Sequence, residues 1–294
     1  MTAPMFERVA LIGFGLIGSS LAHVLRRDQS ARVIVACART QATLDTVKRL
    51  GLADEFTLDP AVAARGADLV VIAAPHSAYR EIAARIESVL APGAILTDVG
   101  SVKGAAVRDL QPHVPPGVHL IPGHPVAGTE YSGPEAGFAE MFAGRWCILT
   151  PVPGTDAAAL DRITRLWLSA GMKVEVMSAD HHDMVLAMTS HLPHLIAYTI
   201  VGTATDLGES LKSEIIKFSA GGFRDFTRIA SSDPVMWRDV FLSNREAVLE
   251  ILQRFTEDLT ALQRAIRWGE GATLEDRFAR TRAIRRSIIE ANQA

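Results

Sequence analysis

Cysteine is scarce in this sequence. The 294 residues include only two, Cys37 and Cys147, and each lies inside a short run of β-branched and apolar residues. Isolated cysteines in strand-like runs are typical of reduced core thiols, and two cannot make a disulfide framework or a cysteine-rich metal site. We therefore expect no disulfide and no bound metal.

An excess of positive charge and a long apolar run are missing as well. The chain has 30 basic and 33 acidic residues, a formal charge of −3, and no basic block. Its start, MTAPMFERVALIG, lacks the pattern of a signal peptide, and no uninterrupted apolar run reaches the length that a bilayer requires. We expect a cytoplasmic protein that binds neither nucleic acid nor membrane.

The chain changes character near residue 177. Before it, β-branched runs such as RVALIG, RVIVACA and ADLVVIAAP alternate with helical stretches, which predicts βαβ units and a parallel sheet. After it, only helical periodicity is visible. The fold class is therefore α/β, with a parallel-sheet domain over residues 1–177 and an all-helical domain over 178–294. The charged end, 274–294, is a last surface helix or a frayed end.

Three glycines mark the first strand-to-helix turn. Gly13, Gly15 and Gly18 form G-x-G-x-x-G directly after a strand-like run and before a helical one. In that context the glycines allow a tight turn, close approach of a pyrophosphate and close helix packing, whereas an isolated match would be an ordinary turn. The motif predicts a Rossmann-type dinucleotide site. Its expected contacts are Gly13, Phe14, Gly15, Leu16, Ile17 and Gly18.

The end of the second strand favours one dinucleotide. An NAD site usually has an acidic residue there, but this chain has Ala38 followed by Arg39 and Thr40. A guanidinium pairs with the 2′-phosphate of NADP, although a solvated loop arginine would look the same in sequence. We expect NADP as the cofactor, with NAD as the alternative, and contacts from Arg39, Thr40 and Pro75.

Chemistry-bearing side chains follow three later strands. His76 comes after one, Asp98, Ser101 and Lys103 after the next, and His124 opens a proline- and glycine-rich loop after the third. Ligands of open parallel sheets bind beyond the carboxyl ends of the strands. A histidine at such an end suits a general base at neutral pH, although a lone histidine is more often structural.

Five motifs, in this order and spacing, carry a family resemblance. They are GFGLIGSSLA, DVGSVK, HPVAGTEYSG, TSHLPH and GGFRDFTRIASSDPVMW. The chain resembles the prephenate/arogenate (cyclohexadienyl) dehydrogenase family of tyrosine biosynthesis from Phe6 to about Ile266. The resemblance implies a Rossmann domain, a helical domain that builds a homodimer, and an active site between the two.

The resemblance also assigns catalytic and binding roles. His124 matches the histidine that takes the proton of the ring hydroxyl, Ser101 its partner at that hydroxyl, and Arg228 the arginine that binds a substrate carboxylate. The histidines expected to line the substrate pocket are His182, His191 and His194. His191 and His194 share a helix face, so two hydrogen-bonded core histidines would give the same pattern.

Three more residues are placed near the substrate. Thr129 and Glu130 lie in the glycine-rich loop, where Glu130 pairs with Arg228 in the empty site or is an exposed carboxylate. Asp225 precedes Arg228 by three residues; in the family, an acidic residue in this region goes with arogenate use. The alternative is that Asp225 caps a turn or pairs with Arg224.

The expected reaction is the oxidative decarboxylation of prephenate, arogenate or both, with hydride transfer to the nicotinamide. L-tyrosine is then a product and a candidate inhibitor. Two other classes stay open: a β-hydroxyacid dehydrogenase or pyrroline-carboxylate reductase, and a non-catalytic NADP sensor. The β-hydroxyacid class would need a catalytic lysine in the helical half, where Lys212 and Lys217 are available but lie in no convincing motif.

Overall fold

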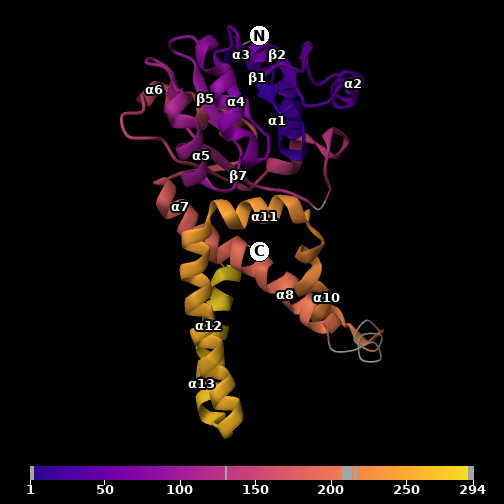
Figure 1. The fold of residues 1–294 in the computed structure, drawn as a ribbon, viewed down its shortest axis with the longest axis vertical. Coiled ribbons are helices and arrows are strands. Elements are labelled where there is room, and N and C mark those ends of the chain that lie inside the picture. The colour runs from indigo at the N-terminus through magenta and orange to yellow at the C-terminus, as the bar shows by residue number, and fades with distance from the viewer. Residues whose placement is uncertain (1–2, 130, 207–213, 215–216, 291–294) are drawn as a thin grey trace. The chain divides into compact units, whose positions relative to one another are not determined.

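The computed structural model describes residues 3–129, 131–206, 214 and 217–290. The chain divides into two compact units, residues 1–245 and 246–294 (Figure 1). The first unit contains every strand and the elements that carry the expected site. The expected boundary between a parallel-sheet domain and a helical domain, at 177/178, is not the division at 245/246. The expected boundary stays a prediction.

A six-stranded parallel sheet forms the centre of the first unit. Its strand order is β3-β2-β1-β4-β5-β6, and all five neighbouring pairs are parallel. Because β1 lies between β2 and β4, the order reverses beside β1, and ligands of open sheets bind at such a reversal. The strands are β1 (Phe6–Ile12), β2 (Ala31–Cys37), β3 (Glu55–Thr57), β4 (Leu69–Ile72), β5 (Ile95–Asp98) and β6 (His119–Leu120).

Helices cover both faces of this sheet. Alternate residues of β1 point to opposite sides: Val9 and Leu11 pack with α1, α2 and α6, whereas Ala10 and Ile12 pack with α3, α4 and α5. Burial on both faces explains the continuous apolar runs that predicted these strands. The helices are α1 (Leu16–Arg27), α2 (Gln41–Arg49), α3 (Pro60–Ala64), α4 (Tyr79–Ile86), α5 (Lys103–Leu110) and α6 (Ala157–Ser169).

A second, three-stranded sheet departs from the all-parallel expectation. Its strands are β7 (Gly123–Val126), β8 (Trp146–Leu149) and β9 (Lys173–Val176), and β7 runs antiparallel to β8. The run VHLIPGHP, expected as one strand, is split between β6 and β7. Pro122 lies at the break, and proline cannot donate the backbone hydrogen bond that an inner strand needs. The small sheet places His124 on β7.

After β9, the described residues form helices and no strand, as the periodicity predicted. The charged C-terminal run is a helix through Glu290 rather than a frayed end. The helices are α7 (Ala179–Leu186), a π-helical turn (Ala187–His191), α8 (Leu192–Asp206), α10 (Gly221–Thr227) and α11 (Pro234–Ser243) in the first unit, and α12 (Arg245–Trp268) and α13 (Gly271–Glu290), which make up nearly all of the second. Short 3₁₀ turns span His76–Ala78, Glu87–Val89, Gln111–His113, Pro134–Ala136, Ala139–Phe142 and Arg228–Ser231.

One helical stretch bears on the expectation about membrane spans. Within the described residues, Ala179–Asp206 is long and apolar enough to cross a bilayer by length and composition alone. Core helices of soluble proteins pass the same test. The stretch also carries His182 and Asp183, whose polar side-chain atoms are hydrogen-bonded inside the protein. The stretch is interrupted by polar residues, so the expectation that no uninterrupted apolar run spans a bilayer is not contradicted.

Candidate active site

The first βα turn has the shape that a dinucleotide requires. Gly13 has φ +107°, and a Cβ there would lie 2.3 Å from the carbonyl oxygen of Ala73. A Cβ on Gly18 would lie 2.3 Å from the carbonyl oxygen of Gly13, so helix and turn touch. A Cβ on Gly15 would meet nothing within 4 Å. Gly13 and Gly18 are therefore required by the packing of the turn itself. The backbone at Gly15 has no protein atom beside it, which leaves space for a ligand.

The start of α1 adds electrostatic support for phosphate. Gly15 is the N-cap of α1, no side chain caps the helix there, and its first turn contains no acidic residue. The free backbone N–H groups and the positive end of the helix dipole favour an anion at this point. These residues fit the pyrophosphate of a dinucleotide.

The residues expected at the adenosine end lie at the end of β2. Ala38 is buried, whereas Arg39 and Thr40 are exposed. The Thr40 hydroxyl accepts a hydrogen bond from the Thr43 backbone as the N-cap of α2. Pro75, expected at the cofactor, is exposed at the end of β4. No acidic side chain follows β2 directly, so the guanidinium of Arg39 is the first charge there.

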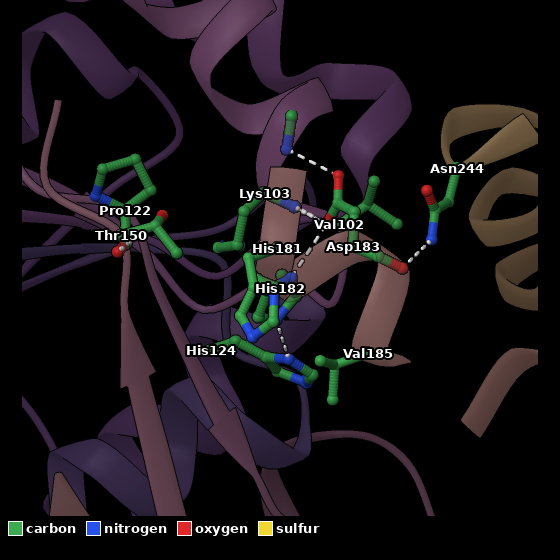
Figure 2. Close-up of polar contacts among 12 residues, drawn as sticks. Val102, Lys103, Pro122, His124, Thr150, His181, His182, Asp183, Val185 and Asn244 are labelled. Carbon is green, nitrogen blue, oxygen red and sulfur yellow. Dashed lines mark hydrogen bonds and ion pairs between the residues drawn. The ribbon is translucent and has the colours of Figure 1, made fainter. Parts of the chain in front are cut away.

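His124 is part of a buried chain of hydrogen bonds (Figure 2). Its Nδ1 lies 2.8 Å from Nε2 of His182, and Nδ1 of His182 lies 2.8 Å from a carboxylate oxygen of Asp183. Burial, followed by the charges of His182 and Lys103, holds the pKa of His124 well below its usual value. His124 is therefore a neutral imidazole at neutral pH and can accept a proton.

Asp183 reaches from α7 to the start of α5. Its two carboxylate oxygens accept the backbone N–H groups of Lys103 at 2.7 Å and Gly104 at 2.8 Å. Val102, the N-cap residue of α5, makes no side-chain cap, so Asp183 supplies the cap from another helix. These hydrogen bonds and the one from His182 hold the pKa of Asp183 below its usual value, although burial opposes them.

A second buried network holds the strand that carries His124. The ammonium of Lys103 lies 2.7 and 2.6 Å from the two carboxylate oxygens of Asp98 and 2.5 Å from the carbonyl oxygen of Gly123. Asp98 also accepts hydrogen bonds from the Gly123 backbone and the Tyr79 hydroxyl. Both side chains of the Asp98–Lys103 pair are fully buried. The pair therefore fixes the backbone directly before His124.

The histidines of TSHLPH lie around Trp237 on α11. The amide of Asn244 donates to the Asp183 carbonyl oxygen and lies 3.1 Å from Nδ1 of His191. Nδ1 of His191 is therefore an acceptor and its Nε2 carries the proton, but this buried Nε2 has no hydrogen-bond partner. His194 donates through Nδ1 to Ser190 and stacks on Trp237 with ring centroids 3.6 Å apart.

The remaining expected site residues are at the surface or near α5. Ser101 is half-buried two residues before α5, and Arg228 is exposed directly after α10. Burial, and to a smaller extent the charge of Arg228, lower the pKa of His194. Thr129 and Asp225 are exposed. Glu130 and Lys212 lie outside the described residues.

Sequence reasoning missed three residues of this site. Asp183, Asn244 and Trp237 bond or stack with the expected histidines. The acidic residue directly after a histidine in the run ADHHDMVL was the available signal for Asp183. Nothing in the local sequence distinguishes Asn244, because its partners lie more than 50 positions away.

An open glycine turn, an uncapped helix start and a neutral buried histidine on β7 define a dinucleotide-dependent oxidoreductase of the Rossmann type. Residues 21–176 match the nucleotide-binding domain of prephenate dehydrogenase, and residues 178–280 match its dimerization domain. The chain belongs to the prephenate dehydrogenase family. This confirms the resemblance and excludes the β-hydroxyacid and pyrroline-carboxylate reductase alternatives at the level of family.

Individual relatives agree with that assignment. The chain is 39% identical to the cyclohexadienyl dehydrogenase of Zymomonas mobilis, with 97% of each chain covered. A crystal structure of Aquifex aeolicus prephenate dehydrogenase with hydroxyphenyl propionate and NAD⁺ matches with a TM-score of 0.89 at 34% identity, covering 98% of this chain and 99% of that one. Synechocystis arogenate dehydrogenase matches with a TM-score of 0.81 at 26% identity, covering 95% and 98%. The chain is a dehydrogenase that uses a nicotinamide dinucleotide.

Proposed function

We propose that the protein catalyses the oxidative decarboxylation of prephenate and L-arogenate, as a cyclohexadienyl dehydrogenase. The observation that carries the proposal is His124, a buried neutral imidazole whose Nδ1 is engaged by His182. Its other nitrogen, Nε2, is then left for the ring hydroxyl of a substrate. A non-catalytic NADP sensor would need the glycine turn but no such base.

The proton movements at His124 can be balanced completely. Nε2 takes the proton of the ring hydroxyl while the carbinol carbon loses a hydride. The bound nicotinamide supplies the hydride acceptor. The bond to the ring carboxylate then breaks, CO₂ leaves, and its electron pair makes the ring aromatic. The resulting phenolate oxygen takes the proton back from His124, so the base is regenerated without net proton release.

Three side chains suit the substrate's polar groups. Arg228 would bind the side-chain carboxylate, because its planar guanidinium can make two parallel hydrogen bonds. Ser101, just before α5, would hold the ring hydroxyl together with His124. The unpartnered N–H of His191 is a buried donor that a ligand oxygen would satisfy, since leaving such a group unpaired costs about 1–3 kcal/mol. His194 would line the same pocket beside Arg228.

The choice between the two substrates concerns one functional group. Prephenate carries a keto group where arogenate carries an ammonium, so a carboxylate nearby favours arogenate. Asp225 lies three residues before Arg228 on an adjoining helix, and its side chain is exposed. Because Arg228 would bind the carboxylate that both substrates share, we expect both to react. Thr129, which is exposed after β7, and Glu130 are proposed as further substrate contacts.

NADP is the proposed cofactor, with NAD as the alternative. Ala38 and Arg39 support it, because the position that holds an acidic residue in typical NAD sites is apolar here and a cation follows. The match to a dimerization domain supports a homodimer, and the biosynthetic relatives support a cytoplasmic location. L-tyrosine, which resembles the product, is a candidate inhibitor.

The decisive experiment is turnover of prephenate and arogenate, each with NAD⁺ and NADP⁺, followed at 340 nm with CO₂ release. Asp225→Asn should lower kcat/KM for arogenate more than for prephenate. Asp161→Asn, which removes an exposed charge on α6, is the matched control. No reduction with either substrate would reject the proposed function. Equal losses on both substrates in Asp225→Asn would assign Asp225 a structural role.

A further inference from the structure

His182 and Asp183 are consecutive residues on α7. The ring of His182 contacts His124 on β7, and the carboxylate of Asp183 accepts from the start of α5. Both ring nitrogens of His182 are engaged, one by His124 and the other by Asp183, and the ring is fully buried. In this arrangement His182 has no nitrogen left for a substrate. Its position is behind the base rather than beside the ligand.

The hydrogen bonds fix the direction of every proton in the chain. The carboxylate of Asp183 is ionised and can only accept, so Nδ1 of His182 must carry a proton and donate. Neutral His182 then has a lone pair on Nε2, which accepts from Nδ1–H of His124. His124 is therefore held with its lone pair on Nε2. Without this chain, the other tautomer of His124 would place a hydrogen where the base is needed.

We propose that His182 and Asp183 form a positioning relay that fixes the tautomer of His124 and stabilises its positive charge when it takes the substrate proton. The inference rests on the proposed function of His124 as the base. The arrangement uses the same physical logic as a carboxylate that orients a catalytic histidine, with a second histidine inserted between them.

The carboxylate at the end of the relay is itself held in place. It accepts the backbone N–H groups of Lys103 and Gly104, and a Cβ on Gly104 would lie only 2.9 Å from its Oδ2. The first turn of α5 therefore leaves little room for the carboxylate to move. The same turn holds Gly123 through the Lys103 ammonium, so α5 orients both the strand that carries His124 and the relay behind it.

The charges around the two imidazoles decide the expected pH response. His124 faces Lys103, His191 and His76 in addition to His182, and His182 faces Lys103, Asp98 and Asp183. The charge of Lys103 and the neighbouring histidines lower the pKa of His124 further after burial, whereas the Asp183 carboxylate favours protonation of His182, the hydrogen-bond partner of His124. Removing the Asp183 charge should therefore shift the acid limb of the kcat profile to lower pH and leave a weaker base.

The test compares Asp183→Asn, His182→Phe and His182→Gln with the parent enzyme. Asp183→Asn and His182→Phe should lower kcat by about 10²-fold or more, with dinucleotide affinity retained. His182→Gln should recover part of the loss, because its amide oxygen can accept from His124 although it cannot carry the charge. Asp156→Asn, which makes the same exchange of Asp for Asn at the N-cap of α6, is the matched control.

Imidazole ¹⁵N spectra give a readout that does not depend on turnover. The parent should show His124 protonated at Nδ1 and deprotonated at Nε2, and His182→Phe should lose this preference. An unchanged kcat and pH profile in Asp183→Asn, with only a lower Tm, would overturn the relay and leave Asp183 as a helix cap. A raised KM alone in His182→Phe would overturn it too. If the parent turns over neither substrate but the spectra show the predicted tautomers, the proposed function fails, and of the relay only the fixed tautomer of His124 stands.

Discussion

The ammonium of Lys103 donates to the carbonyl oxygen of Gly123 at 2.5 Å, directly before His124 in the chain. Lys103 is fully buried with Asp98, and breaking a buried pair by removing one partner typically costs about 3–5 kcal/mol. The sequence places Lys103 at a helix start, but this contact explains why a lysine is buried there. It ties α5 to the strand that carries His124.

His124→Asn should reduce kcat by about 10²–10⁴-fold, the usual contribution of a general base. Dinucleotide binding should be unchanged, because the glycine turn is formed by other residues. Steady-state kinetics and a fluorescence titration of the dinucleotide measure the two effects. His113→Asn, at a ring that bonds the exposed Glu87, is the control. A kcat near that of the parent would remove His124 from the mechanism.

Gly15→Ala and Gly18→Ala should fail in different ways. A methyl group on Gly15 meets no protein atom within 4 Å, so the free protein should keep its Tm while its dinucleotide Kd rises at least about tenfold. A methyl group on Gly18 would lie 2.3 Å from a backbone oxygen, and such overpacking costs about 1–3 kcal/mol. Gly202→Ala, another open position, is the control. A lower Tm in Gly15→Ala would show that Gly15 serves packing rather than the ligand.

Arg228→Ala should raise KM for both substrates strongly, because a charge-assisted pair with a carboxylate is lost. Arg228→Lys should restore little, since an ammonium cannot make two parallel hydrogen bonds. Steady-state kinetics at saturating dinucleotide separate this effect from cofactor binding. Arg238→Ala, an exposed arginine paired with Asp239, is the control. Loss of kcat alone, or of dinucleotide affinity alone, would be incompatible with a carboxylate anchor.

Arg39→Ala should weaken NADP(H) binding and leave NAD(H) binding nearly unchanged, because only NADP carries the 2′-phosphate. Ala38→Asp should move the preference toward NAD by supplying a carboxylate for the ribose hydroxyls. Calorimetric titrations with both dinucleotides measure this, with Arg32→Ala, at the opposite end of β2, as control. Tighter binding of NAD than of NADP by the parent would reverse the cofactor assignment.

The folded protein should lose stability as pH falls from 6.5 toward 4, partly through His76. Burial, and secondly the charge of Lys103, lower the pKa of His76 to about 4, so the unfolded chain binds a proton in this range before the folded one does. Each such group contributes up to about 1.4 kcal/mol per pH unit. Urea unfolding at several pH values should give a shallower dependence for His76→Gln. An unchanged slope would show that His76 takes a proton in the folded state as readily as in the unfolded chain.

Much of the fold was predictable because its signals are local. Strands buried on both faces read as continuous apolar runs, and the conformation of Gly13 demands glycine whatever surrounds it. The second sheet was not predicted, since β7 and β8 look like any other strands until the pairing of His124 with Ile148 is known. His76 illustrates the same limit: its Nε2 accepts a hydrogen bond from the backbone of Val102, 26 positions later in the chain, which nothing in the local sequence indicates.

The sequence by itself determined the class of protein and the glycine turn, and it singled out His124, which it expected after a strand rather than within β7. Only the tertiary structure decided what surrounds that histidine. His124 and His182 are 58 positions apart, and Asp183 caps a helix that begins 80 positions earlier. Hydrogen bonds of this kind have no periodicity and no local motif. They exist because the packing of α7 against α5 desolvates these polar groups, and buried polar groups must then find their partners in one another.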